Sequence, residues 1–250
     1  MQLTPRKACF LEDRETLPNP GSGCRIETQG RAGRVMQFYM LAGTPTGAEC
    51  ARRDPKVAII TKLEAAHSQL TTAIRLYFDD DDLAAIHTLA CAAREIYEKH
   101  CAAQGVERMF EQIEAANPDR SRKELWDILN GPRNWLKHPE ASMDLSARLA
   151  LDDEMNASML WVACHDCAML CRDEQPAEVQ AFIVWFLATR FPRDSQSEAD
   201  NARADEILSG VERTYPGLRT APPDEQKRIG TRMVQHAREM LATLRASRGA

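Results

Sequence analysis

An apolar stripe with helical spacing begins near residue 57, and it constrains the fold of this chain more than any other feature. Residues 57–78 read VAIITKLEAAHSQLTTAIRLYF, in which apolar side chains recur at steps of three and four and so share one helical face. Residues 83–103, LAAIHTLACAAREIYEKHCAA, repeat the pattern. Each segment would run about 30 Å at the helical rise of about 1.5 Å per residue. The expected inward positions are Ile59, Ile60, Leu63, His67, Leu70, Ile74 and Tyr77 in the first helix, and Leu83, Ile86, Leu89, Ala90, Ala93, Ile96 and Tyr97 in the second.

The link between these two segments is the aspartate run at 79–82. A link this short predicts an antiparallel helical hairpin. The last aspartates suit an N-cap and an acidic first turn for the second helix. A Mg²⁺ site is the alternative, but consecutive side chains diverge in direction, which favours a solvated capping turn.

The remainder of the chain also favours helix over strand. Apolar residues make up 44% of the sequence, aromatic residues only 6%, and no run alternates as a strand does. The SRKE of 121–124 is a capping box, and Gly131–Pro132 is expected to end the helix that it opens. We therefore predict an all-α antiparallel helical bundle with additional C-terminal helices, with further helices over about 106–116, 124–130, 152–172, 177–190, 198–213 and 223–246.

The first 55 residues have a different composition. Gly, Pro, Arg, Ser and Thr dominate there, and PNPGSG, TQGRAGR and AGTPTG interrupt any period. We predict a disordered N-terminal tail over 1–55, a helical bundle over 56–192, and a C-terminal helical pair over 193–250 that packs on or next to the bundle.

The distribution of charge limits the classes of partner. The formal charge is −5, while residues 1–53 carry eight Lys or Arg against five Asp or Glu and so have a net charge of +3. An acidic body lacks the broad basic surface of a non-specific nucleic-acid binder. The longest apolar run, at 181–188, is far too short to cross a bilayer. We expect a cytoplasmic protein that is not membrane-bound, with its eight cysteines reduced.

One segment combines residues that could do chemistry. Residues 129–142, LNGPRNWLKHPEAS, place Arg133 and Asn134 four to five residues before His138. Pro132 suits the first turn of a new short helix, and Pro139 disfavours helix at His138. In an unbroken helix, residues five apart point about 140° away from each other. The break is expected to let His138 turn back toward Arg133, so that a phosphate could meet both at a helix start. The alternative is a structural corner.

These residues resemble the R-x(4–6)-H signature, often R-N-x-x-x-H, of HEPN domains, and the likeness covers about 57–175. It implies an all-helical, commonly dimeric, metal-independent RNA endonuclease that needs no cofactor. His138 would then move protons at the ribose 2′-OH and the 5′-oxygen, Arg133 would stabilise the charged phosphorus centre, and Asn134 would orient substrate or imidazole. The chain is also similar to uncharacterised bacterial proteins that share N-[FW]-[FL]-K-H. The expected partners are RNA, an antitoxin or other protein, and a second copy.

Two alternatives to the nuclease remain. The first is a non-catalytic helical interaction or regulatory module that binds a protein partner or an anion such as a nucleotide. The second is a thiol or metal sensor built on Cys164, Cys167 and Cys171, with His165, His100 or Cys101 nearby in sequence. That cysteine spacing also describes one buried helical stripe, and core packing is the preferred interpretation. His67 and His87 are likewise expected to be satisfied core residues that could approach His138.

Overall fold

The structure is a computed structural model that describes residues 58–138, 144, 146–190 and 198–248. The described residues form eight α-helices, one short 3-10 turn and no strand, so the predicted all-α fold is confirmed. The helices are α2 (Lys62–Phe78), α3 (Leu83–Gln104), α4 (Met109–Ala116), α5 (Arg122–Lys137), α6 (Asp153–Cys171), α7 (Ala177–Arg190), α8 (Glu198–Thr214) and α9 (Pro223–Arg248), and the turn η2 spans Arg172–Glu174. The tail predicted over 1–55 lies outside the described residues.

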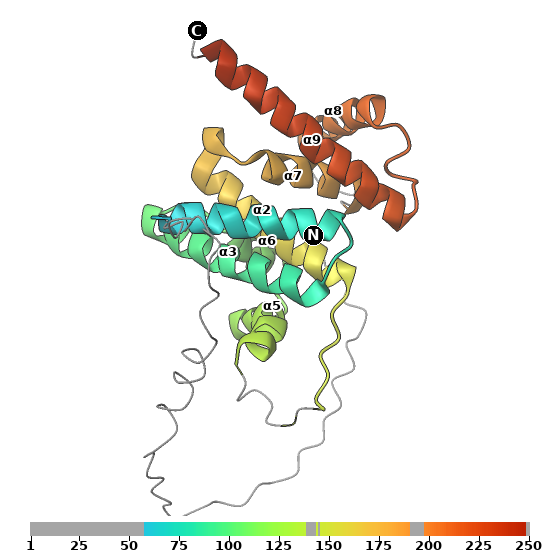
Figure 1. The fold of residues 1–250 in the computed structure, drawn as a ribbon. Coiled ribbons are helices and arrows are strands. Elements are labelled where there is room, and N and C mark those ends of the chain that lie inside the picture. Colours follow the sequence, from blue (N-terminus) through green and yellow to red (C-terminus); the bar gives the residue numbers. More distant parts are fainter. Residues whose placement is uncertain (1–57, 139–143, 145, 191–197, 249–250) are drawn as a thin grey trace, which may run out of the picture. The chain divides into compact units, whose positions relative to one another are not determined.

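The core lies among α2, α3, α6 and α7, which pack side by side (Figure 1). Leu70, Ile74 and Tyr77 of α2 are fully buried, as their spacing predicted. An aromatic cluster fills the centre, where the Tyr77 ring lies 5.9 Å from Phe182 and 5.6 Å from Trp185 in edge-on contacts. Edge-to-face packing of this kind stabilises a core beyond its buried area.

The helical hairpin has the predicted turn, but its first helix starts later than predicted. Thr61 caps α2, because its hydroxyl accepts from the Glu64 backbone N–H at 3.1 Å while the Glu64 carboxylate accepts from the Thr61 N–H at 2.7 Å. Ile59 and Ile60 precede this cap and are 97% and 63% exposed, so their predicted inward positions are wrong. Asp82 caps α3 by accepting from the Ala85 N–H at 2.6 Å, as expected of the aspartate run.

α5 follows the predicted start but not the predicted end. Ser121 and Glu124 form the expected capping box, yet the helix continues through Gly131 and Pro132 to Lys137. The prediction of a break at Gly131–Pro132 is therefore wrong. A Cβ on the residue before a proline disfavours the α-region, and Gly131 has none. Pro132 also leaves the Ile128 carbonyl without its helical donor, and Ile128 is exposed, so water can bind that carbonyl.

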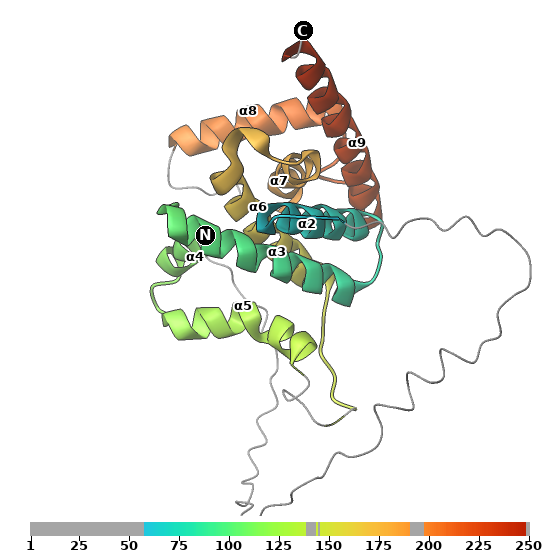
Figure 2. The ribbon, with the colours of Figure 1, turned by 60° about the vertical axis from the view of Figure 1, so that its left-hand side comes forward.

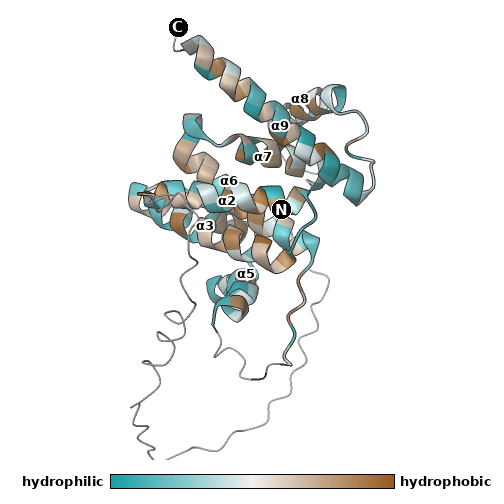
Figure 3. Cartoon of the chain, in the orientation of Figure 1, coloured by the Kyte–Doolittle hydropathy of each residue, from teal (hydrophilic) through white to brown (hydrophobic). Residues whose placement is uncertain are grey.

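The C-terminal helices pack on the bundle. α8 and α9 match the helices predicted over 198–213 and 223–246. α9 lies against α7 and α2, and the Trp185 indole N–H donates to the Gln226 carbonyl at 2.8 Å. Figure 2 shows α8 and α9 on the side of the molecule away from α5, which packs against α3 and α4. In Figure 3, apolar positions recur along α9 up to its C-terminal end.

Candidate functional site

The predicted motif lies at the C-terminal end of α5. The Arg133 guanidinium donates to the Asn134 side-chain oxygen at 3.0 Å, so the structure brings these two residues together. His138 caps the helix, is half-buried, and donates its backbone N–H to the Asn134 carbonyl at 2.9 Å. The helix ends at Lys137, and His138 has extended dihedrals (φ −110°, ψ 104°), as predicted for the residue before Pro139. Arg133, however, lies inside α5 and not at the helix start that was predicted at Pro132. The catalytic roles of Arg133, Asn134 and His138 stay predictions.

The Arg133 guanidinium already has an acidic partner. It forms an ion pair with Glu95 of α3, and the two side chains are 18% and 30% exposed. Two further cations of α5 also form ion pairs. Arg122 pairs with Glu114, and Lys123 pairs with Asp127. An incoming phosphate would therefore have to compete with carboxylates for these cations.

A buried polar network joins α5 to α3, and the sequence analysis missed it. Arg94, only 1% exposed, donates to the Asn130 side-chain oxygen at 2.5 Å and to Glu98 at 3.3 Å. Its guanidinium also lies over the Trp126 ring, with the carbon 5.6 Å from the ring centroid. The sequence signal was an arginine within the apolar stripe of the second helix. Because Asn130 is bonded inside α5 to the Trp126 carbonyl, the network fixes how α5 sits on α3.

A second cluster combines histidine and cysteine from two helices. His67 of α2 and Cys167 and Cys171 of α6 place one ligand atom each within 4.8 Å of one another. The Cys171 sulfur lies 3.4 Å from Nε2 of His67. His67 was expected to be a core residue, but it is half-buried and lines a hollow. The sequence showed the cysteine stripe, but it gave no sign that His67 would lie beside it.

The other predicted candidates have structural partners. Cys164 is fully buried in the core, which supports the packing interpretation for that residue. The Cys101 thiol donates to the Asp166 carbonyl at 3.5 Å, and His165 lies 3.4 Å from the Asp166 carboxylate. His87 is buried, as expected, and its Nδ1 donates to the Asn156 side-chain oxygen of α6 at 3.0 Å. Its Nε2 has no hydrogen-bond partner among the described residues, so the expected satisfied histidine is met at one ring nitrogen only. The described side-chain hydrogen-bond partners of His67 and His87 thus lie in α6, and the His67 ring also lies 5.9 Å from the Tyr97 ring of α3.

Burial holds the thiols of the cluster in their neutral form. It raises the pKa of Cys167 to about 12, although the Tyr97 hydroxyl beside it acts in the opposite direction. It also raises the pKa of Cys171 and lowers the pKa of His67. A nucleophilic or easily oxidised cysteine needs a lowered pKa, so the metal-free cluster is not a reactive thiolate centre.

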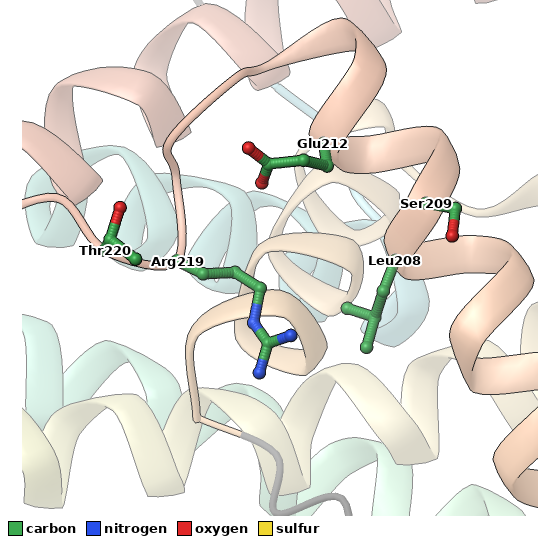
Figure 4. A pocket seen from close by; sticks show the side chains of 5 residues that line it. All are labelled: Leu208, Ser209, Glu212, Arg219 and Thr220. Atoms are coloured by element: carbon green, nitrogen blue, oxygen red, sulfur yellow. The ribbon is translucent and has the colours of Figure 1, made fainter.

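Two hollows are described, and Arg133, Asn134 and His138 line neither. The larger, which we call the α7–α9 hollow, has a volume of about 830 Å³ and is lined by residues of α2, η2, α7 and α9, including His67. The smaller, of about 450 Å³, lies between α8 and the loop before α9, with Glu212 and Arg219 at its edge (Figure 4). Glu212 is already used there as the acceptor of the Gly217 N–H at 2.8 Å, a structural contact.

Within the described part of the chain, no helix has both the length and the apolar character required to span a bilayer. No family model matches the chain, and neither the curated proteins nor the solved structures contain a match to it.

Proposed function

We propose that this protein is a non-catalytic helical interaction module, and that its α7–α9 hollow receives an acidic amphipathic helix of a partner protein. The observation that carries this proposal is an apolar stripe on α9 that continues past the turns packed on the bundle. Ile229, Met233 and Val234 are buried, whereas Met240 and Leu244, farther along the same helix, are 54% and 49% exposed. Exposed apolar side chains in a row at helical spacing are typical of a binding surface.

The hollow beside this stripe supplies the rest of the surface. Ile183 and Val184 of α7 and Leu241 and Leu244 of α9 give it apolar walls. A partner helix with apolar residues at steps of three and four could lay one face against these walls.

The charges at the hollow favour an acidic partner. Arg172 and Arg245 line it, with Glu174 as the single acidic side chain in its lining. Arg238 lies about two turns before Arg245 on the same side of α9, and its own partner is Glu178 of α7. Two copies of α9 running antiparallel would bring such arginines together, so a second copy fits this surface less well than an acidic helix.

Binding of a fluorescent probe peptide tests the proposal. The peptide has about 20 residues, leucines at helical spacing and glutamates on its flanks, and the control peptide has the same composition in scrambled order. We expect saturable binding of the first peptide only. Leu244→Asp should weaken it at least about tenfold, because it places a charge on the apolar wall. Ala242→Asp, on the far side of the helix, is the matched control.

Three results would overturn the proposal. The first two are that the wild type does not bind the peptide and that Leu244→Asp and Ala242→Asp weaken peptide binding equally. The third is a concentration-dependent dimer that Leu244→Asp abolishes, because it would assign the surface to a second copy. Arg245→Glu tests the role of charge, because it should weaken binding of the acidic peptide and not binding of a basic one.

RNA cleavage by the α5 motif is the second candidate. The hydrogen bond between Arg133 and Asn134 favours it, since it holds a guanidinium and an amide together near the histidine that ends the helix. The test is incubation of the protein with mixed RNA in EDTA. Cleavage that His138→Ala removes and Lys137→Ala leaves intact would establish the nuclease, and no cleavage in any of the three proteins would exclude it.

A further inference from the structure

We propose that His67, Cys167 and Cys171 form a binding site for a thiophilic divalent metal ion, with Zn²⁺ as the expected ion. His67 also lines the α7–α9 hollow, but the apolar side chains of its wall supply no donor, so the two proposals can fail separately. Its donors come from two helices, one imidazole from α2 and two thiols from α6, and all three atoms lie within 4.8 Å of one another. Soft thiolate sulfur combined with imidazole nitrogen is a donor set that zinc prefers in proteins.

The distances suit a tetrahedral ion. Zinc binds cysteine sulfur at about 2.3 Å and histidine nitrogen at about 2.0–2.1 Å, so neighbouring donors of a tetrahedral site lie roughly 3.5–3.8 Å apart. The Cys171 sulfur and the His67 Nε2 are 3.4 Å apart already. The other two separations are no more than 4.8 Å, so they need a contraction of at most about 1 Å, which side-chain rotation can provide.

The backbone explains why the two cysteines converge. Cys167 and Cys171 are four residues apart on α6, and residues at this spacing lie one above the other on a helical face. Cys164 continues the same face but is fully buried and lies outside the cluster. His67 enters from α2 because α2 packs against α6.

A buried polar group points to the same site. Tyr97 of α3 is fully buried, and its hydroxyl has no well-aligned hydrogen-bond partner among the described residues. It lies beside the Cys167 thiol, whose ionised form it favours. When a metal displaces the thiol proton, the resulting thiolate can accept a hydrogen bond from this hydroxyl. The orphaned hydroxyl would then be satisfied in the metal-bound protein.

The site adjoins an open hollow. His67 lies on the wall of the α7–α9 hollow together with Glu174 and Gln175. Glu174 lines this hollow with His67 and acts electrostatically on both His67 and Cys171. Either the Glu174 carboxylate or a water can complete the site, and three protein donors with an accessible fourth position characterise sites that exchange ligands.

Cobalt titration of the full chain tests the site directly. Cys9, Cys24 and Cys50, which lie outside the described residues, are replaced by serine so that they cannot supply thiolates. The protein is reduced and stripped of metal with a chelator, then titrated with Co²⁺ and, by chelator competition, with Zn²⁺. We expect one equivalent to bind, with tetrahedral ligand-field bands and thiolate-to-cobalt charge transfer in the spectrum.

Four variants make the outcome specific. His67→Gln and Cys171→Ser should each weaken Zn²⁺ binding at least about 100-fold, and Tyr97→Phe, which removes only an outer partner, about tenfold. Cys91→Ala, in a buried thiol of α3 outside the cluster, should leave binding unchanged. Circular dichroism of the metal-free proteins verifies that each variant folds. A wild type without thiolate charge transfer, or a Cys171→Ser protein that keeps it, would overturn the site.

Discussion

Arg133 of α5 and Glu95 of α3 form an ion pair between helices that are separated by α4 in the sequence. The pair uses the guanidinium that the nuclease motif would need for phosphate, and it leaves that group only 18% exposed. A phosphate that bound Arg133 would therefore have to displace Glu95 from it.

The first prediction concerns the strength of this pair. Glu95→Gln should lower the free energy of unfolding by about 0.5–1 kcal/mol, because both side chains are partly solvated and water screens their attraction. Arg133→Ala should have a similar effect, and the double variant should lose less than the sum of the two. Urea unfolding measures all three. Lys123→Ala is the control. It breaks the ion pair of Lys123 with Asp127, and because the lysine side chain is 84% exposed, the free energy of unfolding should change by less than about 0.5 kcal/mol.

The second prediction concerns the buried network beside it. Asn130→Ala removes the acceptor at 2.5 Å from Arg94 and leaves a buried guanidinium with fewer partners. The expected loss is about 1–3 kcal/mol, the penalty for an unsatisfied buried polar group. Asn134 lies one turn later and is exposed, so Asn134→Ala should lower the free energy of unfolding by less than about 0.5 kcal/mol. Equal losses in the two variants would show that the network does not hold α5 in place.

The helices themselves could be predicted because their signals are local. The apolar steps of 62–78 and 83–104, the Asp82 cap and the Ser121–Glu124 box all lie within a few residues of what they determine. The signal that sets the start of α2 is equally local, since Thr61 and Glu64 form the same kind of capping box. The apolar Ile59 and Ile60 before it suggested a longer helix, and the cap determines the start instead.

The sites depend on contacts that the sequence does not display. Cys171 lies beside His67, 104 residues earlier in the chain, because α2 and α6 pack together. Glu95 and Arg94 are neighbours in the sequence, yet both reach α5, one at Arg133 and the other at Asn130. No spacing rule encodes such pairings. The passage of α5 through Pro132 was missed for a different reason, because a single exposed carbonyl without a donor is tolerable where water can reach it.

The third prediction is a dependence of stability on pH through His87. Burial lowers the pKa of His87, and its hydrogen bond to Asn156 offsets this only in part. The folded protein therefore binds fewer protons at this residue than the unfolded chain, whose histidine titrates near about 6.5. Stability should fall as the pH decreases below that value. His87→Gln cannot become charged, so the loss between about pH 6.5 and pH 5 should be smaller than in the wild type. Unfolding midpoints at matched ionic strength measure the difference, and parallel pH profiles for the two proteins would contradict the prediction.

The last prediction compares two glycines within helices. A Cβ at Gly230 of α9 would lie 2.2 Å from the Phe78 ring of α2, much closer than real Cβ contacts allow. Gly230→Ala should therefore destabilise the protein by about 1–3 kcal/mol, because the ring is held inside the aromatic cluster and α9 must move away. At Gly210 of α8 the added Cβ meets only the end of the Arg213 side chain, at 3.9 Å. Gly210→Ala should stabilise the protein by about 0.5–1 kcal/mol, the difference in helix propensity between the two residues. Opposite signs for the same substitution, read from thermal or urea unfolding, are the expected result. A stabilising Gly230→Ala would mean that α9 does not approach Phe78 as closely as the structure places it.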